Sequence, residues 1–268
     1  FTPGHEWAGE VAAVGPGVSK FSVGDRVAGE AHNGCGYCSN CLNGRYNLCL
    51  NYGKKESGHA HYGFNTTGAY AQYNVVSVKA VTRLDQAVSF AEGALIDTAG
   101  AVLHGMELSG ITPGGETAVV GPGPIGLIAM RMAKALGSAR VIVIGRGARL
   151  EKARELGAEG LINFEESDPV ETLLEITGGR GVNELFECSG AKGTLDQGIQ
   201  MVSKGGKVVL LGVPSPTLRE QVNFRHIIHN QVSILGSRAN PNVAWKISSL
   251  IAAKKMREIG RASCRERV

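Results

Sequence analysis

A short apolar strand that runs directly into a glycine turn and then into a helix constrains the fold of this chain more than any other feature. Residues 116–120 (ETAVV) precede the turn GPGPIG at residues 121–126, and apolar residues continue at helical spacing after it. In this arrangement Gly121 turns the chain, Gly123 admits a pyrophosphate to the backbone, and Gly126 lets helix and strand pack closely. The segment therefore predicts a strand–turn–helix unit that binds a dinucleotide.

Further strands and helices alternate after this unit. Strands are expected at residues 140–144, 160–163, 182–187, 207–211 and 232–235, with helices between most of them. Such alternation is typical of the α/β class. It predicts a doubly wound parallel sheet, the Rossmann fold, in which the cofactor crosses the sheet where the strand order reverses.

The cofactor's adenosine ribose is expected to meet the segment VIGRG at residues 143–147. An NAD site places a carboxylate at this strand end, about twenty residues beyond the glycine turn, and none is present here. Gly145 leaves room, and Arg146 can pair with a 2′-phosphate through two parallel hydrogen bonds, so the sequence favours NADP over NAD. Arg149 either assists or caps the next helix. A Gly145→Asp substitution is expected to reverse the preference.

Two later strands lead at their carboxyl ends into segments that are expected to line the ribose and the nicotinamide. Cys188 is interpreted as a wall of this pocket without a redox role. The predicted cofactor-binding residues are Gly121, Gly123, Pro124, Ile125, Gly126, Gly145, Arg146, Arg149, Ser189, Gly212 and Val213.

Four cysteines fall within fifteen residues in the pattern C-x2-C-x2-C-x7-C, namely Cys35, Cys38, Cys41 and Cys49. Thiolates at these spacings can surround one tetrahedral ion, which favours zinc over buried or disulfide-paired cysteines. A shell of four thiolates leaves no position for water or substrate. We therefore predict a structural zinc that stabilises a loop.

The composition fits a globular protein with two domains. The 268 residues are 43% hydrophobic and 19% charged, which suits two packed cores and not a disordered chain. Scattered lysines and arginines give a net charge of +4, so no nucleic-acid surface is expected. No apolar run is long enough for a bilayer, and we expect a cytoplasmic protein without membrane association. His59 and His61 form an H-x-H pair and are interpreted as solvated loop histidines in preference to metal ligands.

The segment GHEWAGEVAAVG at residues 4–15, with GDRV at residues 24–27, precedes the four cysteines and the Rossmann segment. In this order the motifs resemble the zinc-containing medium-chain alcohol dehydrogenases, particularly the sorbitol (L-iditol) and threonine dehydrogenase branch, over nearly all of residues 1–257. The resemblance implies a partial GroES-like, β-rich catalytic domain ahead of the Rossmann domain. It also implies that His5 is a ligand of a catalytic zinc and that Glu6 is a ligand or a partner that exchanges with water.

The resemblance places Asp97 where many polyol dehydrogenases have a glutamate ligand. Aspartate is one methylene shorter, so direct ligation, support of a ligand and capping of the following helix all stay open. The implied reaction is reversible oxidation of a secondary alcohol or polyol: zinc polarises the hydroxyl and hydride passes to the nicotinamide. Two alternatives are a quinone or enoyl reductase of the same superfamily without a catalytic zinc, and a non-catalytic NADP-binding protein.

The domain assignment follows from these motifs. Residues 1–88 are assigned to the GroES-like domain, residues 89–257 to the Rossmann domain, and residues 258–268 to a non-native tail that abandons the preceding helical pattern. The family's catalytic cysteine, its proton relay and the C-terminal return of the catalytic domain are expected to lie outside the chain. We therefore expect little catalysis from these residues alone, and a homo-oligomer acting on a small molecule when the protein is complete.

Overall fold

The computed structural model describes residues 2–256, and these residues form two compact units. The first unit consists of residues 2–104 and 239–256, and the second of residues 105–238. The predicted non-native tail at residues 258–268 lies outside the described residues.

This division differs from the predicted boundary at residue 88. Helix α2 (Phe90–Gly93) contacts strands β1 (Ala8–Glu10) and β2 (Arg26–Gly29), and helix α9 (Ala244–Ala252) contacts β5 (Val81–Arg83). Both helices therefore belong to the first unit. The assignment of residues 89–257 to the Rossmann domain included both segments, because a sequence pattern does not show which sheet an apolar helix face covers.

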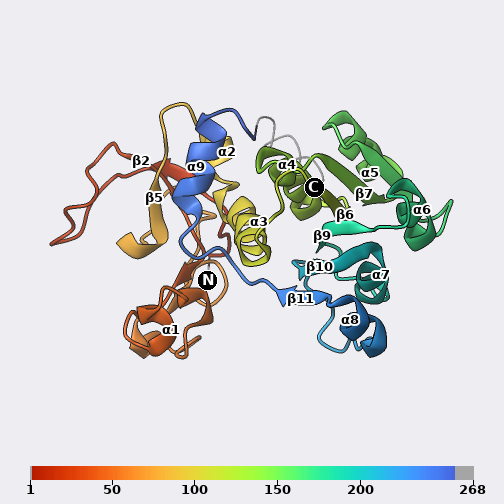
Figure 1. Ribbon diagram of the computed structural model, residues 1–268. Helices are drawn as coiled ribbons and strands as arrows, with labels where there is room; N and C mark the ends of the chain where they lie inside the picture. The colour runs from red at the N-terminus through yellow and green to blue at the C-terminus, as the bar shows by residue number, and fades with distance from the viewer. Residues whose placement is uncertain (1, 257–268) are drawn as a thin grey trace. The chain divides into compact units, whose positions relative to one another are not determined.

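The second unit is built on one parallel sheet. Its strands are β6 (Glu116–Val120), β7 (Arg140–Gly145), β8 (Gly160–Asn163), β9 (Val182–Glu187), β10 (Val202–Leu210) and β11 (Ser233–Gly236). They lie in the order β11-β10-β9-β6-β7-β8, and every neighbouring pair is parallel. Figure 1 labels β6, β7, β9, β10 and β11 in this unit. The order reverses at β6, which lies between β7 and β9. The predicted doubly wound sheet is confirmed, and β6, β8 and β9 have the predicted bounds.

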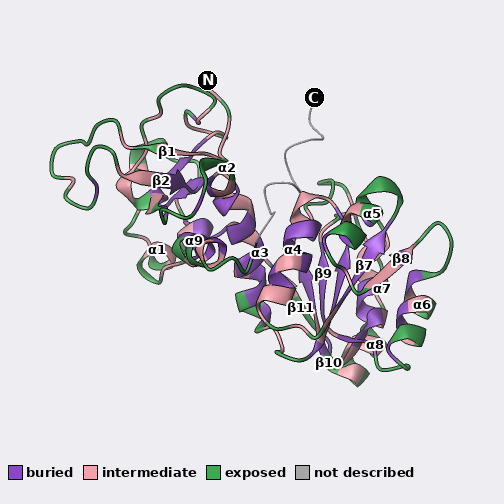
Figure 2. Cartoon of the chain, turned by 90° about the horizontal axis from the view of Figure 1, so that it is seen from above, coloured by how far each residue is buried: buried purple, intermediate pink, exposed green. Residues whose placement is uncertain are grey.

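Helices connect these strands and cover the sheet. They are α4 (Pro124–Ala135), α5 (Gly147–Glu155), α6 (Pro169–Ile176), α7 (Thr194–Met201) and α8 (Phe224–Asn230). In β7, residues 141–145 are all buried, which requires cover on both faces of the sheet. The core joins aliphatic side chains of the strands to Leu173 of α6 and Ile199 of α7, and Figure 2 shows these strands as the most buried part of the unit. The sheet therefore holds the loops at its carboxyl edge in fixed positions.

The first unit is rich in short strands. It contains the antiparallel sheet β1-β2-β5, the hairpin of β3 (His32–Asn33) with β4 (Ala60–His61), and the helices α1 (Ser39–Leu42) and α3 (Ile96–Ser109), of which α3 continues into the second unit. The unit also contains three short 3-10 helices, which are η1 (Tyr46–Leu48), η2 (Lys55–Ser57) and η3 (Val78–Ala80). Arg26 of β2 donates to the carbonyl oxygens of Asp85, Gln86 and Val88, so one guanidinium fixes the turn between β5 and α2.

Residues 239–256 return to the first unit after β11. The Asn242 side chain donates to the Gly44 carbonyl oxygen at 2.8 Å, and its backbone N–H donates to the Tyr46 hydroxyl, also at 2.8 Å. Ser248 of α9 accepts a hydrogen bond from the Asp85 backbone N–H at 3.1 Å. The predicted loss of the catalytic domain's C-terminal return is therefore corrected, because part of that return is present in residues 239–256.

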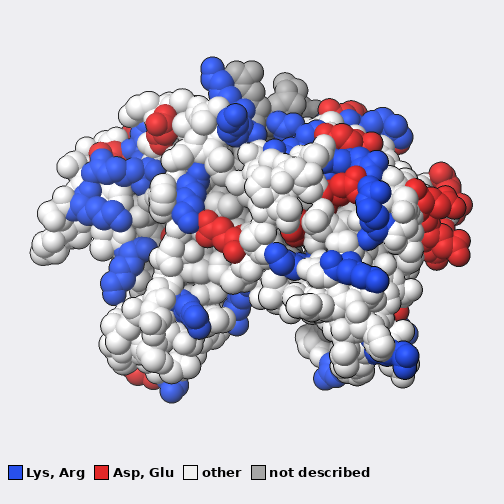
Figure 3. All heavy atoms as spheres, viewed as in Figure 1, with Lys and Arg blue, Asp and Glu red and all other residues white. Residues whose placement is uncertain are grey.

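Lysine and arginine side chains are scattered over the face drawn in Figure 3, where white and red atoms separate the blue ones. Among residues 2–256, no helix combines the length and the apolar character that a bilayer crossing requires.

Candidate functional site

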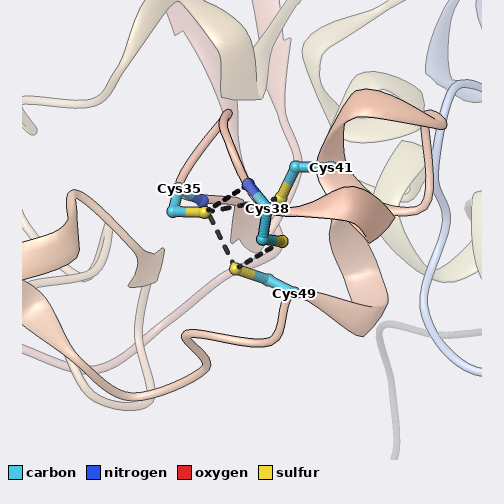
Figure 4. A group of neighbouring side chains, drawn as sticks. All are labelled: Cys35, Cys38, Cys41 and Cys49. Atoms are coloured by element: carbon cyan, nitrogen blue, oxygen red, sulfur yellow. Dashed lines mark hydrogen bonds between the residues drawn. The ribbon is translucent and has the colours of Figure 1, made fainter.

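Four cysteine sulfurs converge in the loop between β3 and η2. Cys35 follows β3, Cys38 and Cys41 lie at α1, and Cys49 follows η1. All four Sγ atoms lie within 4.8 Å of one another, with 3.9 Å between Cys35 and Cys41 and 4.0 Å between Cys38 and Cys49 (Figure 4). A tetrahedral zinc ion with Zn–S bonds of about 2.3 Å sets sulfur–sulfur separations of about 3.8 Å. The four sulfurs therefore fit zinc without rearrangement of the loop.

Hydrogen bonds to the cysteine sulfurs favour the thiolate form, which binds a cation. Backbone N–H groups of Cys38 and Cys35 donate to the sulfurs of Cys35 and Cys49, respectively, both at 3.4 Å, and the Asn51 amide donates to Cys35. Burial raises the pKa of the Cys35 thiol, but hydrogen bonds from the Asn51 amide and from the backbone N–H groups of Tyr37 and Cys38 lower it, to about 6. Burial raises the pKa of Cys41 to about 12, and the neighbouring sulfurs of the cluster add to this rise, because a further thiolate is costly beside the others. A bound dication removes that cost, since thiolates are the form that ligates metal.

His5 and Asp97 meet in the first unit. His5 Nε2 lies 3.8 Å from Asp97 Oδ2, and the two side chains are 35% and 13% exposed. Asp97 Oδ1 accepts hydrogen bonds from the Ala31 backbone N–H at 2.9 Å and from the Asn240 amide at 3.0 Å. These two donors hold one carboxylate oxygen and turn the other toward His5, an arrangement typical of a metal-ligating carboxylate.

Asp97 lies in the first turn of α3 but does not cap that helix. It is the second residue of α3, and its side-chain hydrogen bonds run to Ala31 and Asn240 and not to backbone N–H groups of the first helical turn. Burial raises the pKa of Asp97, while the Ala31 N–H, His5 and Asn240 oppose this rise. Of the three roles that the sequence left open, the geometry favours ligation or support of a ligand.

Glu6 is exposed and turned to Thr98, whose hydroxyl donates to its Oε1. Among residues 2–256, the four cysteines are the only group of three or more histidine, cysteine or acidic side chains with ligand atoms close enough for one ion. His5 and Asp97 therefore form a pair that Glu6 does not complete in this structure.

A buried acid lies near this pair and was missed by the sequence analysis. Glu30 is 6% exposed and accepts a hydrogen bond from the Tyr46 hydroxyl at 2.7 Å. Burial raises the pKa of Glu30 to about 7, the Tyr46 hydrogen bond lowers it, and the negative charge of Asp97 raises it further. Because the same hydroxyl accepts from the Asn242 N–H, Glu30 and Tyr46 tie β2, the cysteine lobe and the returning segment together.

The H-x-H pair does not lie in a solvated loop. His59 and His61 are 2% and 8% exposed, and the prediction that they are solvated is wrong. His61 belongs to β4, where its ring stacks on His32 at 4.1 Å and on Phe64 at 4.0 Å between centroids. The pairing of β4 with β3 places His61 opposite His32, a cross-strand contact that the polar surroundings in the sequence did not indicate.

The three glycines of the turn after β6 differ in what surrounds them. Gly121 has a φ of +90°, and a Cβ there would lie 2.8 Å from Ser189 Cβ. A Cβ at Gly123 would meet no atom within 4 Å, whereas one at Gly126 would lie 2.0 Å from the Gly121 carbonyl oxygen. The first and third glycines therefore permit tight packing, and the second leaves open space above the N-terminus of α4, where Pro124 is the first residue.

This open space is a cleft of about 1080 Å³ at the carboxyl edge of the sheet. Of the predicted cofactor-binding residues, it is lined by Gly121, Gly123, Pro124, Ile125, Gly145, Arg146, Arg149 and Ser189. Gly126 is buried beneath the turn, and Val213 is 92% exposed. A Cβ at Gly212 would lie 2.3 Å from the Gly190 backbone nitrogen, so this glycine permits close packing of two loops.

Gly145 has a steric role. A Cβ at this position would lie 2.3 Å from Pro122 Cδ, so any side chain would displace the glycine turn. Gly145→Asp is therefore expected to disturb the glycine turn in addition to its predicted effect on the cofactor preference. Arg146 follows, with its Nη1 2.5 Å from Glu165 Oε1 and its guanidinium carbon 5.6 Å from the centre of the Phe164 ring.

A buried carboxylate organises the loop that follows β9. Glu187 is 3% exposed, and its Oε1 accepts from the backbone N–H groups of Ser189 at 2.9 Å and Gly190 at 3.1 Å, and from the Thr194 hydroxyl at 3.2 Å. Burial raises the pKa of the Cys188 thiol, which keeps it protonated and agrees with a wall residue. The sequence feature that could have identified Glu187 is its position as an acidic residue directly after the apolar residues Leu185 and Phe186.

Comparisons with known proteins agree with both units. Residues 1–86 match the alcohol dehydrogenase GroES-like domain, and residues 124–252 match the zinc-binding dehydrogenase domain. A sorbitol dehydrogenase of Bacillus subtilis is 37% identical over 237 residues, which is 88% of this chain and 65% of that protein. The chain thus spans about two thirds of that relative's length.

Two further similarities point the same way. An L-threonine 3-dehydrogenase of Pyrococcus abyssi is 38% identical over 211 residues, or 78% of this chain and 58% of that protein. The solved structure of a zinc-binding dehydrogenase of Sinorhizobium meliloti, bound to NADP, superposes with a TM-score of 0.88 at 31% identity, covering 95% of this chain and 73% of that one. This chain therefore belongs to the zinc-containing medium-chain alcohol dehydrogenase family, in the sorbitol and threonine dehydrogenase branch.

Proposed function

We propose that the protein reversibly oxidises a secondary alcohol or polyol, with zinc and a nicotinamide cofactor. The observation that carries this proposal is the pair of His5 and Asp97, with Nε2 and Oδ2 3.8 Å apart. Ligands bonded to one tetrahedral zinc at about 2.0–2.2 Å are about 3.4 Å apart, so a small side-chain movement brings the pair within ligating distance. The sorbitol and threonine dehydrogenases among its relatives favour a hydroxylated small molecule as substrate.

Each residue has a defined part in this proposal. His5 and Asp97 would hold the catalytic zinc; when bound, the zinc would supply polarisation of the substrate hydroxyl and the nicotinamide would supply the hydride acceptor. Ala31 and Asn240 keep the Asp97 carboxylate oriented through Oδ1. Glu6 either joins the ligands or exchanges with water, and this requires it to leave Thr98. Cys35, Cys38, Cys41 and Cys49 hold a structural zinc with no open position.

The cleft at β6 is proposed to bind the dinucleotide. Its pyrophosphate would face Gly123 and the first turn of α4, where no side chain caps the helix and the helix dipole favours an anion. Arg146 lines the same cleft and favours NADP over NAD. A cytoplasmic location and a homo-oligomeric state stay predictions.

Hydride transfer and zinc content test the proposal together. The complete protein, of which these residues are expected to be a part, is incubated with a series of polyols and secondary alcohols and with NAD or NADP, and formation of reduced nicotinamide is followed optically. Asp97→Asn keeps the shape of the side chain but removes its charge. We therefore expect kcat/KM to fall at least about a hundredfold, and one zinc ion per chain to be lost or bound with lower affinity. Asp25→Asn makes the same chemical change beside Arg83 and serves as the matched control.

Two outcomes would contradict the proposal. The first is reduction of a quinone or an enoyl substrate by a protein that holds one zinc per chain, which would favour the reductase alternative. The second is nucleotide binding without turnover of any substrate by a protein that holds both zinc ions, which would favour a non-catalytic role.

A further inference from the structure

The turn after β8 supplies a carboxylate to the cofactor cleft. Strands β7 and β8 are parallel with Gly145 opposite Asn163, so the residues that follow each strand emerge side by side. Arg146 follows β7, and Phe164 and Glu165 follow β8, and all three line the cleft. The position of Glu165 follows from this register and is not evident from its distance of 19 residues from Arg146 in the sequence.

Glu165 forms an ion pair with Arg146, the residue that is proposed to bind the 2′-phosphate. Its Oε1 lies 2.5 Å from Arg146 Nη1, and the two side chains are 51% and 63% exposed. An ion pair this exposed contributes little to stability, so Arg146 can leave Glu165 at small cost. The Glu165 backbone N–H is held by Asn163 Oδ1 at 3.1 Å, which keeps this residue at the same end of the cleft when Arg146 leaves.

A carboxylate cannot be placed on β7 itself. Gly145 packs against the Pro122 ring, where a Cβ would lie 2.3 Å from Cδ, so the usual position of the acidic residue of an NAD site is sterically closed. Glu165 brings negative charge to the same end of the cleft from the neighbouring strand. A 2′-phosphate carries close to two negative charges at neutral pH and would meet this charge, whereas a 2′-hydroxyl can donate to it.

We propose that Glu165 is a specificity-determining residue that opposes the 2′-phosphate and so limits the preference for NADP that Arg146 confers. The inference rests on the proposed nucleotide site and adds a residue to it. Two residues that contact each other then act in opposite directions: Arg146 favours binding of the 2′-phosphate and Glu165 disfavours it. The protein therefore discriminates less between NADP and NAD than it would with Arg146 alone.

Binding of NADP and of NAD, measured by calorimetry without substrate, tests this inference independently of catalysis. The two nucleotides differ only in the 2′-phosphate. Glu165→Gln should tighten NADP binding roughly three- to tenfold. The same substitution should change NAD binding by less than about twofold, or weaken NAD binding. High salt should reduce the gain in NADP affinity. Circular dichroism verifies folding of the variant, which is expected because the side chain is half exposed.

Glu166→Gln is the matched control. It removes the same charge one residue later, from a carboxylate that accepts from Asn163 Nδ2 at 2.6 Å and does not line the cleft. Equal effects of Glu165→Gln and Glu166→Gln, or equal tightening of both nucleotides, would overturn the inference while leaving the proposed function intact. Failure of the wild-type protein to bind either nucleotide would overturn the proposed nucleotide site and this inference with it.

Discussion

Gly145 illustrates what single residues disclose before a structure is known. Its place at the end of an apolar strand was correctly identified from the sequence, as was the absence of a carboxylate there. The reason for the glycine is the Pro122 ring packed against it, a contact between segments 23 residues apart that no local pattern indicates. Arg146 could be chosen from the sequence because it is adjacent to the strand, whereas Glu165 depends on the register of two strands.

Replacing Arg146 has a predicted direction and size. Arg146→Ala should weaken NADP binding roughly tenfold to a hundredfold and leave NAD binding nearly unchanged, because a charge-assisted pair to a phosphate contributes about 1.5–3 kcal/mol. The measurement is a calorimetric titration with each nucleotide. Arg154→Ala removes a cation from α5, the helix that follows Arg146; Arg154 pairs with Glu151 outside the cleft, and its loss should alter neither affinity. Equal weakening of both nucleotides by Arg146→Ala would contradict the assignment.

Glu30 should make stability depend on pH. Its pKa is about 7 when folded and 4.5 as the ordinary value, so the folded chain holds a proton that the unfolded chain has lost between these limits. The free energy of unfolding should therefore fall as pH rises from 4.5 to about 7, by up to about 3 kcal/mol. Denaturant unfolding of Glu30→Gln should lack this component, while Glu10→Gln, at an exposed position of β1, should retain it. Parallel pH profiles for the wild-type protein and Glu30→Gln would exclude the effect.

At the scale of elements, the sequence predicted most of what local periodicity determines. Strands β6, β8 and β9 and the turn before α4 follow from apolar runs bounded by glycine. The helical pattern that contains α9 was recognised from the sequence, but the strands that α9 and α2 contact were not, because the surface that an amphipathic helix covers is a tertiary property. The cysteine lobe was predictable for the opposite reason, since four ligands close in sequence need little tertiary information to converge.

The cysteine lobe should lose one metal ion when one ligand is removed. Cys38→Ser should lower the zinc content by one equivalent per chain, because three thiolates leave the tetrahedral shell open. Cys188→Ser is the matched control, since that thiol lies outside the cluster, and it should retain all the zinc. Metal analysis of the two purified variants makes the comparison. Loss of every zinc ion from a well-folded Cys38→Ser protein would contradict the division into structural and catalytic metal.

The loop after β9 should depend on Glu187. In Glu187→Ala, the backbone N–H groups of Ser189 and Gly190 lose their buried acceptor, and we expect the free energy of unfolding to fall by roughly 2–4 kcal/mol. Nucleotide affinity should fall as well, because Ser189 lines the cleft. Glu175→Ala, at an exposed position of α6, should change neither quantity. Urea denaturation and nucleotide titration supply both measurements, and an unchanged affinity would show that the loop is held by other contacts.

At the scale of the whole molecule, metal and nucleotide depend on different units. Each unit buries a core of its own, formed by aliphatic side chains of the parallel sheet in the second and by Ala60, Tyr62 and Ala80 in the first. The cysteine lobe and the pair of His5 and Asp97 both belong to the first unit, whereas the nucleotide cleft belongs to the second. Zinc binding should therefore stabilise the first unit directly.

Chelation should separate the two metals and the two units. A zinc held by His5 and Asp97 keeps open positions and should leave first, whereas the ion enclosed by four thiolates should leave only under conditions that loosen the lobe. Calorimetry during stepwise chelation should show the transition of the first unit moving to lower temperature when the second equivalent leaves. NADP should raise the other transition throughout, because the cleft lies in the second unit. If both metals left together in a single step of the chelation, or if chelation abolished the stabilisation by NADP, metal and nucleotide binding would have to be assigned to one cooperative structure.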